Sequence, residues 1–124
     1  MAKGTFAPED DVAAIVQMFG ARLKDAAQPL TLLVRMKMRD GTRDEVDAAF
    51  ALARQATLKD AGVIAFDLNR DASDPNVIVV YERWRNLHDL EGHLRTPHAT
   101  AHRQAFNELV AGLPEFTVLT PVTV

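Results

Sequence analysis

Hydrophobic residues recur along the chain at two spacings, and the spacing changes from one segment to the next. In the first segment, five apolar residues recur at the interval of one helix face: Val12, Ile15, Val16, Phe19 and Leu23. Pro8 suits the first turn of a helix, the acidic residues 9–11 complement its positive end, and Gln28-Pro29 stops it. We therefore expect a helix over residues 8–27, in an N-terminal extension formed by residues 1–29.

From residue 30 onward, alternating and β-prone runs are separated by helical patterns and turns. Strands are expected over residues 30–38, 63–69, 77–84 and 116–122, with a loop of turn-forming residues at 70–76. The first helix between them is expected to begin with a capping box of Thr42 and Glu45 and to end before Gly62. A short helix over about 86–94 follows, and another begins at Thr96-Pro97 and ends near Ala111.

This order predicts the fold class. A β-α-β-β-α-β sequence is typical of an α+β, ferredoxin-like domain with one antiparallel sheet and its helices on a single face. We assign residues 30–124 to this domain. The second face of such a sheet has no cover within the chain, so a partner sheet from a second copy, and hence a homodimer, is expected.

Composition limits the classes of function. The chain has 124 residues, a formal net charge of −3 and no cysteine. Without a basic excess we expect no nucleic-acid partner, and without cysteine there is no disulfide or thiolate metal site. No apolar stretch approaches the roughly 20 residues that span a bilayer, and no secretory signal is visible. No membrane partner and a cytoplasmic location are therefore expected.

All four histidines of the chain fall between residues 88 and 102, shortly after the aromatic strand end at residues 81–84. Because imidazole takes and returns a proton near neutral pH, this region is the candidate for acid–base chemistry. His93 is either a base or a structurally hydrogen-bonded residue. His98 lies just inside a helix start, where the helix dipole favours the neutral ring. His88 is expected at the surface.

Two further features of this region have alternative interpretations. His98 and His102 stand four residues apart, a spacing that can hold a metal, but no third ligand has a fixed spacing from them, so no metal is expected. Trp84, the only tryptophan, is either a core residue or a flat wall for an aromatic ligand. Phe66 and Phe106 are expected in the core, where some of these side chains can also line a cavity.

Several motifs together resemble the antibiotic biosynthesis monooxygenase family, in its quinol-monooxygenase-like branch. They are Ala61-Gly62 before the second strand, Asp74-Pro75-Asn76, Tyr81-Glu82-Arg83-Trp84, and His93-Leu94-Arg95-Thr96-Pro97-His98. The likeness spans residues 30–122 and leaves the N-terminal helix outside. It implies a dimeric α+β barrel with a pocket in each subunit, and oxygenation of electron-rich aromatics without flavin, haem or metal.

The resemblance also implies site residues. His93 matches the family's histidine, and Trp84 and Tyr81 match its aromatic strand positions. The implied activity is a cofactor-independent monooxygenase that oxidises a small phenolic or quinol-type aromatic with molecular oxygen. Such a substrate supplies the electrons itself once a base has removed its proton. His93 is the candidate base and Trp84 the stacking wall. The candidate substrate-binding residues are Tyr81, His98, Phe66 and Arg83, with Arg83 or Arg95 stabilising the anion.

Two other functions stay open at this point. One is a non-enzymatic dimeric module that binds a small aromatic or haem-like ligand. The other is an isomerase of a small phosphorylated sugar derivative, which needs more basic residues in the pocket than the sequence offers.

Overall fold

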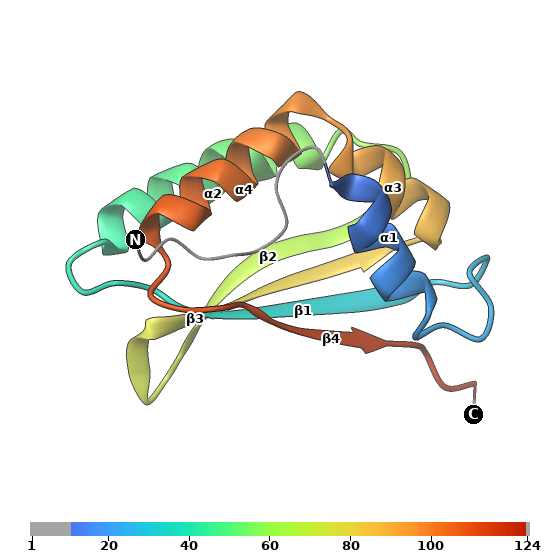
Figure 1. Cartoon of the computed structure of the whole chain (residues 1–124), viewed down its shortest axis with the longest axis horizontal. Helices are drawn as coiled ribbons and strands as arrows, with labels where there is room; N and C mark the ends of the chain where they lie inside the picture. Colours follow the sequence, from blue (N-terminus) through green and yellow to red (C-terminus); the bar gives the residue numbers. More distant parts are fainter. Residues whose placement is uncertain (1–10, 124) are drawn as a thin grey trace.

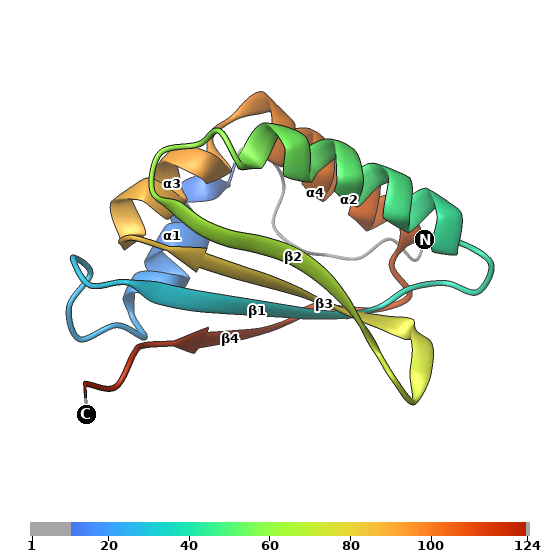
Figure 2. The same cartoon turned by 180° about the vertical axis from the view of Figure 1, so that it is seen from behind.

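A computed structural model describes residues 11–123 of the chain. One antiparallel sheet carries the helices on a single face (Figures 1 and 2). The strands are β1 (Leu30–Lys37), β2 (Val63–Asp71), β3 (Asp74–Trp84) and β4 (Glu115–Leu119), arranged in the order β2-β3-β1-β4. The helices are α1 (Val12–Gly20), α2 (Arg43–Thr57), α3 (Leu87–Leu94) and α4 (Pro97–Leu109). The predicted α+β, ferredoxin-like arrangement is confirmed.

Alternate residues of the two central strands point under the helices and form the core. On β3 these residues are Ile78, Val80, Glu82 and Trp84, all of them buried. The antiparallel register places Leu32 of β1 opposite Glu82 and so aligns the buried rows of the two strands. The helices complete the core with apolar side chains: Val46 and Phe50 from α2, Leu90 from α3, and Phe106 from α4.

Two helix starts are confirmed and one capping interaction is wrong. The side chain of Asn86 accepts a hydrogen bond from the amide of Asp89 (2.8 Å), and Thr96 accepts one from Ala99 (3.2 Å), so α3 and α4 are both capped. Thr42 precedes α2 but makes no capping bond, because its backbone (φ −102°, ψ 7°) is not extended. Its hydroxyl instead donates to the carbonyl of Arg39 at 2.6 Å.

The N-terminal helix is shorter than predicted. It ends at Gly20 rather than at residue 27, and the predicted start at Pro8 lies outside the described residues. A Cβ at Gly20 would lie 3.3 Å from Cδ2 of Leu87, so glycine allows the close approach of α1 to α3, while its low helix propensity favours an end there. Phe19 is buried in the same core as the sheet, and its ring meets Phe116 of β4 edge-on at 5.6 Å.

The loop predicted over residues 70–76 is also wrong, because most of it is strand. β2 runs to Asp71 and β3 begins at Asp74, which leaves only residues 72–73 between them. Ion pairs from β1 support this hairpin, with Arg35 at 3.0 Å from Asp71 and Lys37 at 2.6 Å from Asp74. At the other sheet edge, β4 ends at Leu119 rather than at residue 122.

The sheet face opposite the helices carries a mixture of apolar and charged side chains. Leu33 and Tyr81 are direct cross-strand partners at its centre, with Arg35 opposite Val79 beside them. None of the helices within residues 11–123 has the length and apolar character that crossing a membrane requires.

The packing of α1 predicts the effect of removing its main anchor. Phe19→Ala should lower the free energy of unfolding by about 3–5 kcal/mol, because Phe19 is 1% exposed and its loss leaves a hole against Phe116. Urea denaturation measures the change. Leu52→Ala is the control, since Leu52 is 73% exposed on α2 and should change stability by no more than about 0.5 kcal/mol. Equal stability of both variants would show that α1 adds nothing to the core.

Candidate active site

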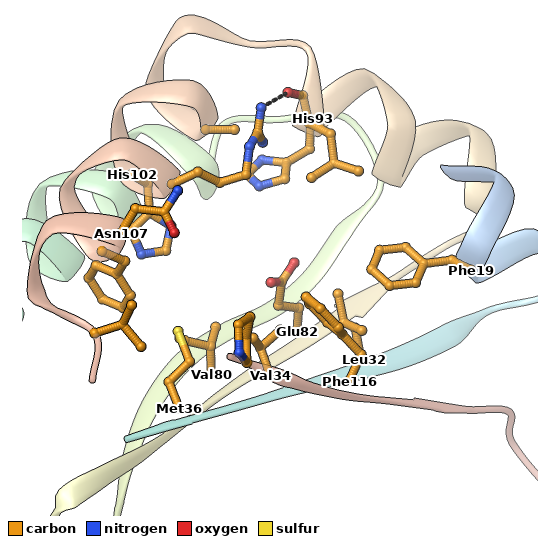
Figure 3. Close-up of a pocket in the computed structure, with 16 residues that line it drawn as sticks. Phe19, Leu32, Val34, Met36, Val80, Glu82, His93, His102, Asn107 and Phe116 are labelled. Carbon is orange, nitrogen blue, oxygen red and sulfur yellow. Dashed lines mark hydrogen bonds between the residues drawn. The ribbon is translucent and has the colours of Figure 1, made fainter. Parts of the chain in front are cut away.

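A cavity lies between the sheet and the helices, with about 70 Å³ of free volume (Figure 3). Most of its lining is apolar, from the sheet, from α1 and from α4: Phe19, Leu32, Val34, Met36, Val80, Phe106 and Phe116. The polar lining residues are Glu82, His93, His102, Arg103 and Asn107. A cavity of this volume has room for a few water molecules.

His93, in the last turn of α3, has a fixed orientation. Its side chain is 4% exposed, and its Nδ1 lies 2.8 Å from Oδ2 of Asp60, which follows α2. The Trp84 ring packs against it with 4.7 Å between ring centroids. A carboxylate only accepts hydrogen bonds, so the contact with Asp60 places the proton on Nδ1 and makes Nε2 the acceptor nitrogen.

The electrostatic environment keeps this imidazole neutral. Burial lowers the pKa of His93, although the hydrogen bond and the charge of Asp60 oppose the shift. His98, in the first turn of α4, also reaches Asp60, with its Nε2 2.8 Å from the same Oδ2. Asp60, which follows the end of α2, therefore contacts both the end of α3 through His93 and the start of α4 through His98.

The carboxyl group of Glu82 lies in the otherwise apolar floor of the cavity. In Figure 3 its carboxyl group points from β3 toward the helices. Its Oε1 accepts a hydrogen bond from the indole N–H of Trp84 at 3.0 Å. Burial raises the pKa of Glu82 to about 7, against the opposing effects of that hydrogen bond and of the Arg103 charge. Glu82 can therefore either accept or donate a hydrogen bond near neutral pH.

His102 is the second imidazole of the cavity. Its ring packs edge-on against Phe106, with 4.3 Å between centroids, and against Phe50 and Phe66. Burial lowers the pKa of His102 to about 4, so the ring is neutral at pH 7. Its buried Nε2 has no hydrogen-bond partner among the described residues.

The structure brings some of the predicted site residues together and separates others. Of the predicted set, His93 lines the cavity, while Trp84 is fully buried behind it and touches both His93 and, through its N–H, Glu82. Phe66 lies behind His93, with its ring 5.6 Å away. His98 meets Asp60 outside the cavity lining and does not form a pair with His102.

Tyr81, Arg83 and Arg95 lie away from the cavity. Tyr81 and Arg83 alternate with the buried residues of β3, which places their side chains on the open face of the sheet. Arg95 is exposed and forms an ion pair with Glu91 at 2.9 Å.

Sequence reasoning did not predict Glu82 or Asp60 as site residues, and it considered His102 only as a possible metal-ligand partner of His98. Glu82 carries a readable signal, because it stands between Val80 and Trp84 on the buried side of an alternating strand. Asp60 carries none, since its partner His93 is 33 residues away in the sequence.

Comparisons with known proteins agree with this fold. The sequence model of the antibiotic biosynthesis monooxygenase family matches residues 29–105. The structure of Rv0793 from Mycobacterium tuberculosis is 26% identical, with 78% of this chain and 98% of that chain covered and a TM-score of 0.71. PA3566 from Pseudomonas aeruginosa is 23% identical, with 80% and 99% covered and a TM-score of 0.69. An antibiotic biosynthesis monooxygenase is 21% identical, with 76% and 99% covered and a TM-score of 0.71. No curated protein matches the chain.

The buried carboxyl group of Glu82 predicts that wild type and Glu82→Gln differ in stability by an amount that depends on pH. Below the ordinary Glu pKa of 4.5 both the folded and unfolded states hold the Glu82 proton, and between pH 4.5 and 7 only the folded state does. This group therefore makes wild-type stability fall as pH rises through that window. Glu82→Gln removes the effect, so the stability of the variant relative to wild type should rise by roughly 3 kcal/mol from pH 4.5 to 8.

Denaturant unfolding of both proteins across this pH range measures the difference. Glu45→Gln, at an exposed position in the first turn of α2, is the control and should leave the wild-type pH dependence unchanged. A Glu82→Gln difference that stays constant between pH 4.5 and 8 would contradict the raised pKa.

Proposed function

The chain belongs to the antibiotic biosynthesis monooxygenase family, and on that premise we propose that it oxidises a small phenolic or quinol-type aromatic with molecular oxygen. One observation carries the proposal. His93 is a buried imidazole that lines an apolar cavity and is held from behind by the carboxylate of Asp60. A neutral, oriented imidazole in an apolar pocket is the group that proton removal from a phenol requires.

The proposed reaction begins with proton transfer. Nε2 of His93 takes the hydroxyl proton of the substrate, and Asp60 stabilises the imidazolium that forms. The resulting phenolate gives up an electron to oxygen far more readily than the phenol does. The oxygen then bonds to a ring carbon, and loss of one water leaves a quinone, so that one O₂ is consumed for each substrate oxidised.

The other residues of the cavity position the substrate. Glu82 binds a second oxygen of the ring, as acceptor from a hydroxyl or as donor to a carbonyl, because its pKa lies near neutral pH. Trp84 positions both polar groups, since its ring packs on His93 and its N–H bonds to Glu82. Phe66 supports His93 from behind, and His98 fixes Asp60. Tyr81 and Arg83 have no role in this proposal, because they lie on the open face of the sheet.

Removal of the proposed base predicts a loss of oxygen uptake. With a quinol or naphthol that the wild type oxidises, His93→Gln should cut the rate by about 10²–10⁴-fold, since it keeps polarity and approximate size but cannot take the proton. An oxygen electrode measures the rate. His88→Gln is the matched control, because His88 is exposed on the same helix and should keep the wild-type rate.

The outcomes separate the candidate functions. A His93→Gln rate equal to wild type across pH 6 to 8 would show that His93 is not the base. If the wild-type protein binds such aromatics, with a change in Trp84 fluorescence, but consumes no oxygen with any of them, the chain is a binding module and the proposed activity is wrong.

We also propose that two copies of the chain pair through the open face of the sheet. This face has apolar side chains at its centre, Leu33 and Tyr81, and none of the helices between residues 11 and 123 covers it. A specific dimer interface buries more than about 1,000 Å² in total, an area that two facing sheets supply.

The dimer is tested by light scattering at micromolar concentration. Wild type should have the mass of two chains, and Leu33→Lys should have the mass of one, because a charge is introduced at the centre of the interface. Leu52→Lys makes the same change at an exposed position of α2 and should remain dimeric. A monomeric wild type would rule the dimer out.

A further inference from the structure

Three side chains that commonly bind metals meet beside the cavity, from three separate segments of the chain. Asp60 lies in the turn after α2, His93 in the last turn of α3 and His98 in the first turn of α4. Oδ2 of Asp60 lies 2.8 Å from Nδ1 of His93 and 2.8 Å from Nε2 of His98. All three ligand atoms lie within 4.8 Å of one another. We propose that Asp60, His93 and His98 bind a divalent metal ion of the Zn²⁺ class.

The distances among these atoms require side-chain movements of about an ångström to accept the ion. In a tetrahedral site with metal–ligand bonds of about 2.0–2.1 Å, neighbouring ligand atoms stand roughly 3.3 Å apart. The two contacts of Asp60 therefore open by about half an ångström as the metal replaces the shared protons, and the two imidazole nitrogens, which lie no more than 4.8 Å apart, close by at most about 1.5 Å. Such a shift is within reach of an Asp side chain in a turn and of a histidine ring on a helix end.

The exposure of the three ligands leaves one side of the site open. The His93 side chain is 4% exposed, whereas those of Asp60 and His98 are 15% and 26% exposed. Solvent therefore supplies an entry path and a water molecule as the fourth ligand. Two imidazoles and one carboxylate form a donor set that suits borderline first-row metals rather than Mg²⁺ or Ca²⁺, which prefer oxygen ligands throughout.

The two histidines are oriented before any ion binds. The ring of His93 packs on Trp84, and its carbonyl accepts hydrogen bonds from the amide of Thr96 (3.0 Å) and from the Thr96 hydroxyl (2.7 Å). Thr96 also caps α4, which carries His98. The junction between α3 and α4 thus fixes the relative positions of both imidazoles, so less freedom is lost when the metal binds.

Metal binding at this point would change what His93 presents to the cavity. A neutral imidazole that binds a metal through Nδ1 carries its proton on Nε2. The cavity nitrogen of His93 would change from acceptor to donor, and a ligand there would meet an N–H group in place of a base. The metal-bound and base forms of His93 are therefore mutually exclusive.

The experiment titrates the untagged full chain with Zn²⁺ by calorimetry and with Ni²⁺ by fluorescence at pH 7.5. We expect one ion per chain, and quenching of Trp84, the only tryptophan, by Ni²⁺ bound at the adjacent His93. His98→Gln and Asp60→Asn should each weaken binding by at least about tenfold. His88→Gln changes an exposed histidine of α3 in the same way and should bind both ions as the wild type does. Circular dichroism confirms that each variant is folded.

Two results would overturn the site. One is failure of the wild type to bind Zn²⁺ at concentrations below about 1 mM. The other is binding that survives in both His98→Gln and Asp60→Asn, which places the ion elsewhere. Nitrogen NMR of the Zn²⁺-loaded protein tests the ligand atom, because Nε2 of His93 should be protonated, and an unprotonated Nε2 would contradict coordination through Nδ1. None of these measurements uses substrate oxidation, so their outcome is independent of the proposed enzyme activity.

Discussion

The twofold alternation of side chains along β3 determines which groups can reach the cavity. Because the helices cover one face of the sheet only, every second residue from Ile78 to Trp84 of β3 is buried, and the residues between them lie on the open face. Glu82 and Trp84 belong to the buried row, and Tyr81 and Arg83 to the other. A shift of one residue in the pairing with β1 would exchange the two rows. The position of Glu82 in the cavity floor thus depends on the same register that builds the core.

Three titratable side chains of this core, Glu82, His102 and His93, are accommodated in different ways. The carboxyl of Glu82 keeps a hydrogen bond from Trp84 and shifts its pKa toward neutrality, so it does not remain a buried charge. His102 stays neutral among phenylalanine rings. His93 keeps a charged partner, but Asp60 lies toward solvent and so retains part of its hydration. The cavity therefore gathers these three groups beside the buried guanidinium of Arg103, whose charge favours the ionised form of Glu82.

Local sequence patterns predicted most of the strands and helices, because residue spacing, caps and turns act within a few residues. The order of these elements then predicted that the helices lie on one face of the sheet. The errors arose where tertiary contacts decide: Gly20 ends α1 at its contact with Leu87, and ion pairs from β1 extend the β2–β3 hairpin through residues that favour turns. In the site, His93 was predicted from its motif, but its partner was not. Nothing near Asp60 in the sequence indicates a contact with α3 and α4, because that contact exists only after the sheet has brought the end of α2 beside them.

The closeness of the four histidines in the sequence suggested one site, and the fold divides them. His88 is exposed, His102 faces the cavity, and His98 turns away from it to Asp60. Only His93 both contacts Asp60 and lines the cavity: its Nδ1 lies at Asp60, and its ring is part of the cavity lining. The two nitrogens of one imidazole share a single proton in the neutral state, so the occupant of one nitrogen fixes the character of the other. Chemistry in the apolar cavity is therefore coupled, through one ring, to the polar and partly exposed surroundings of Asp60.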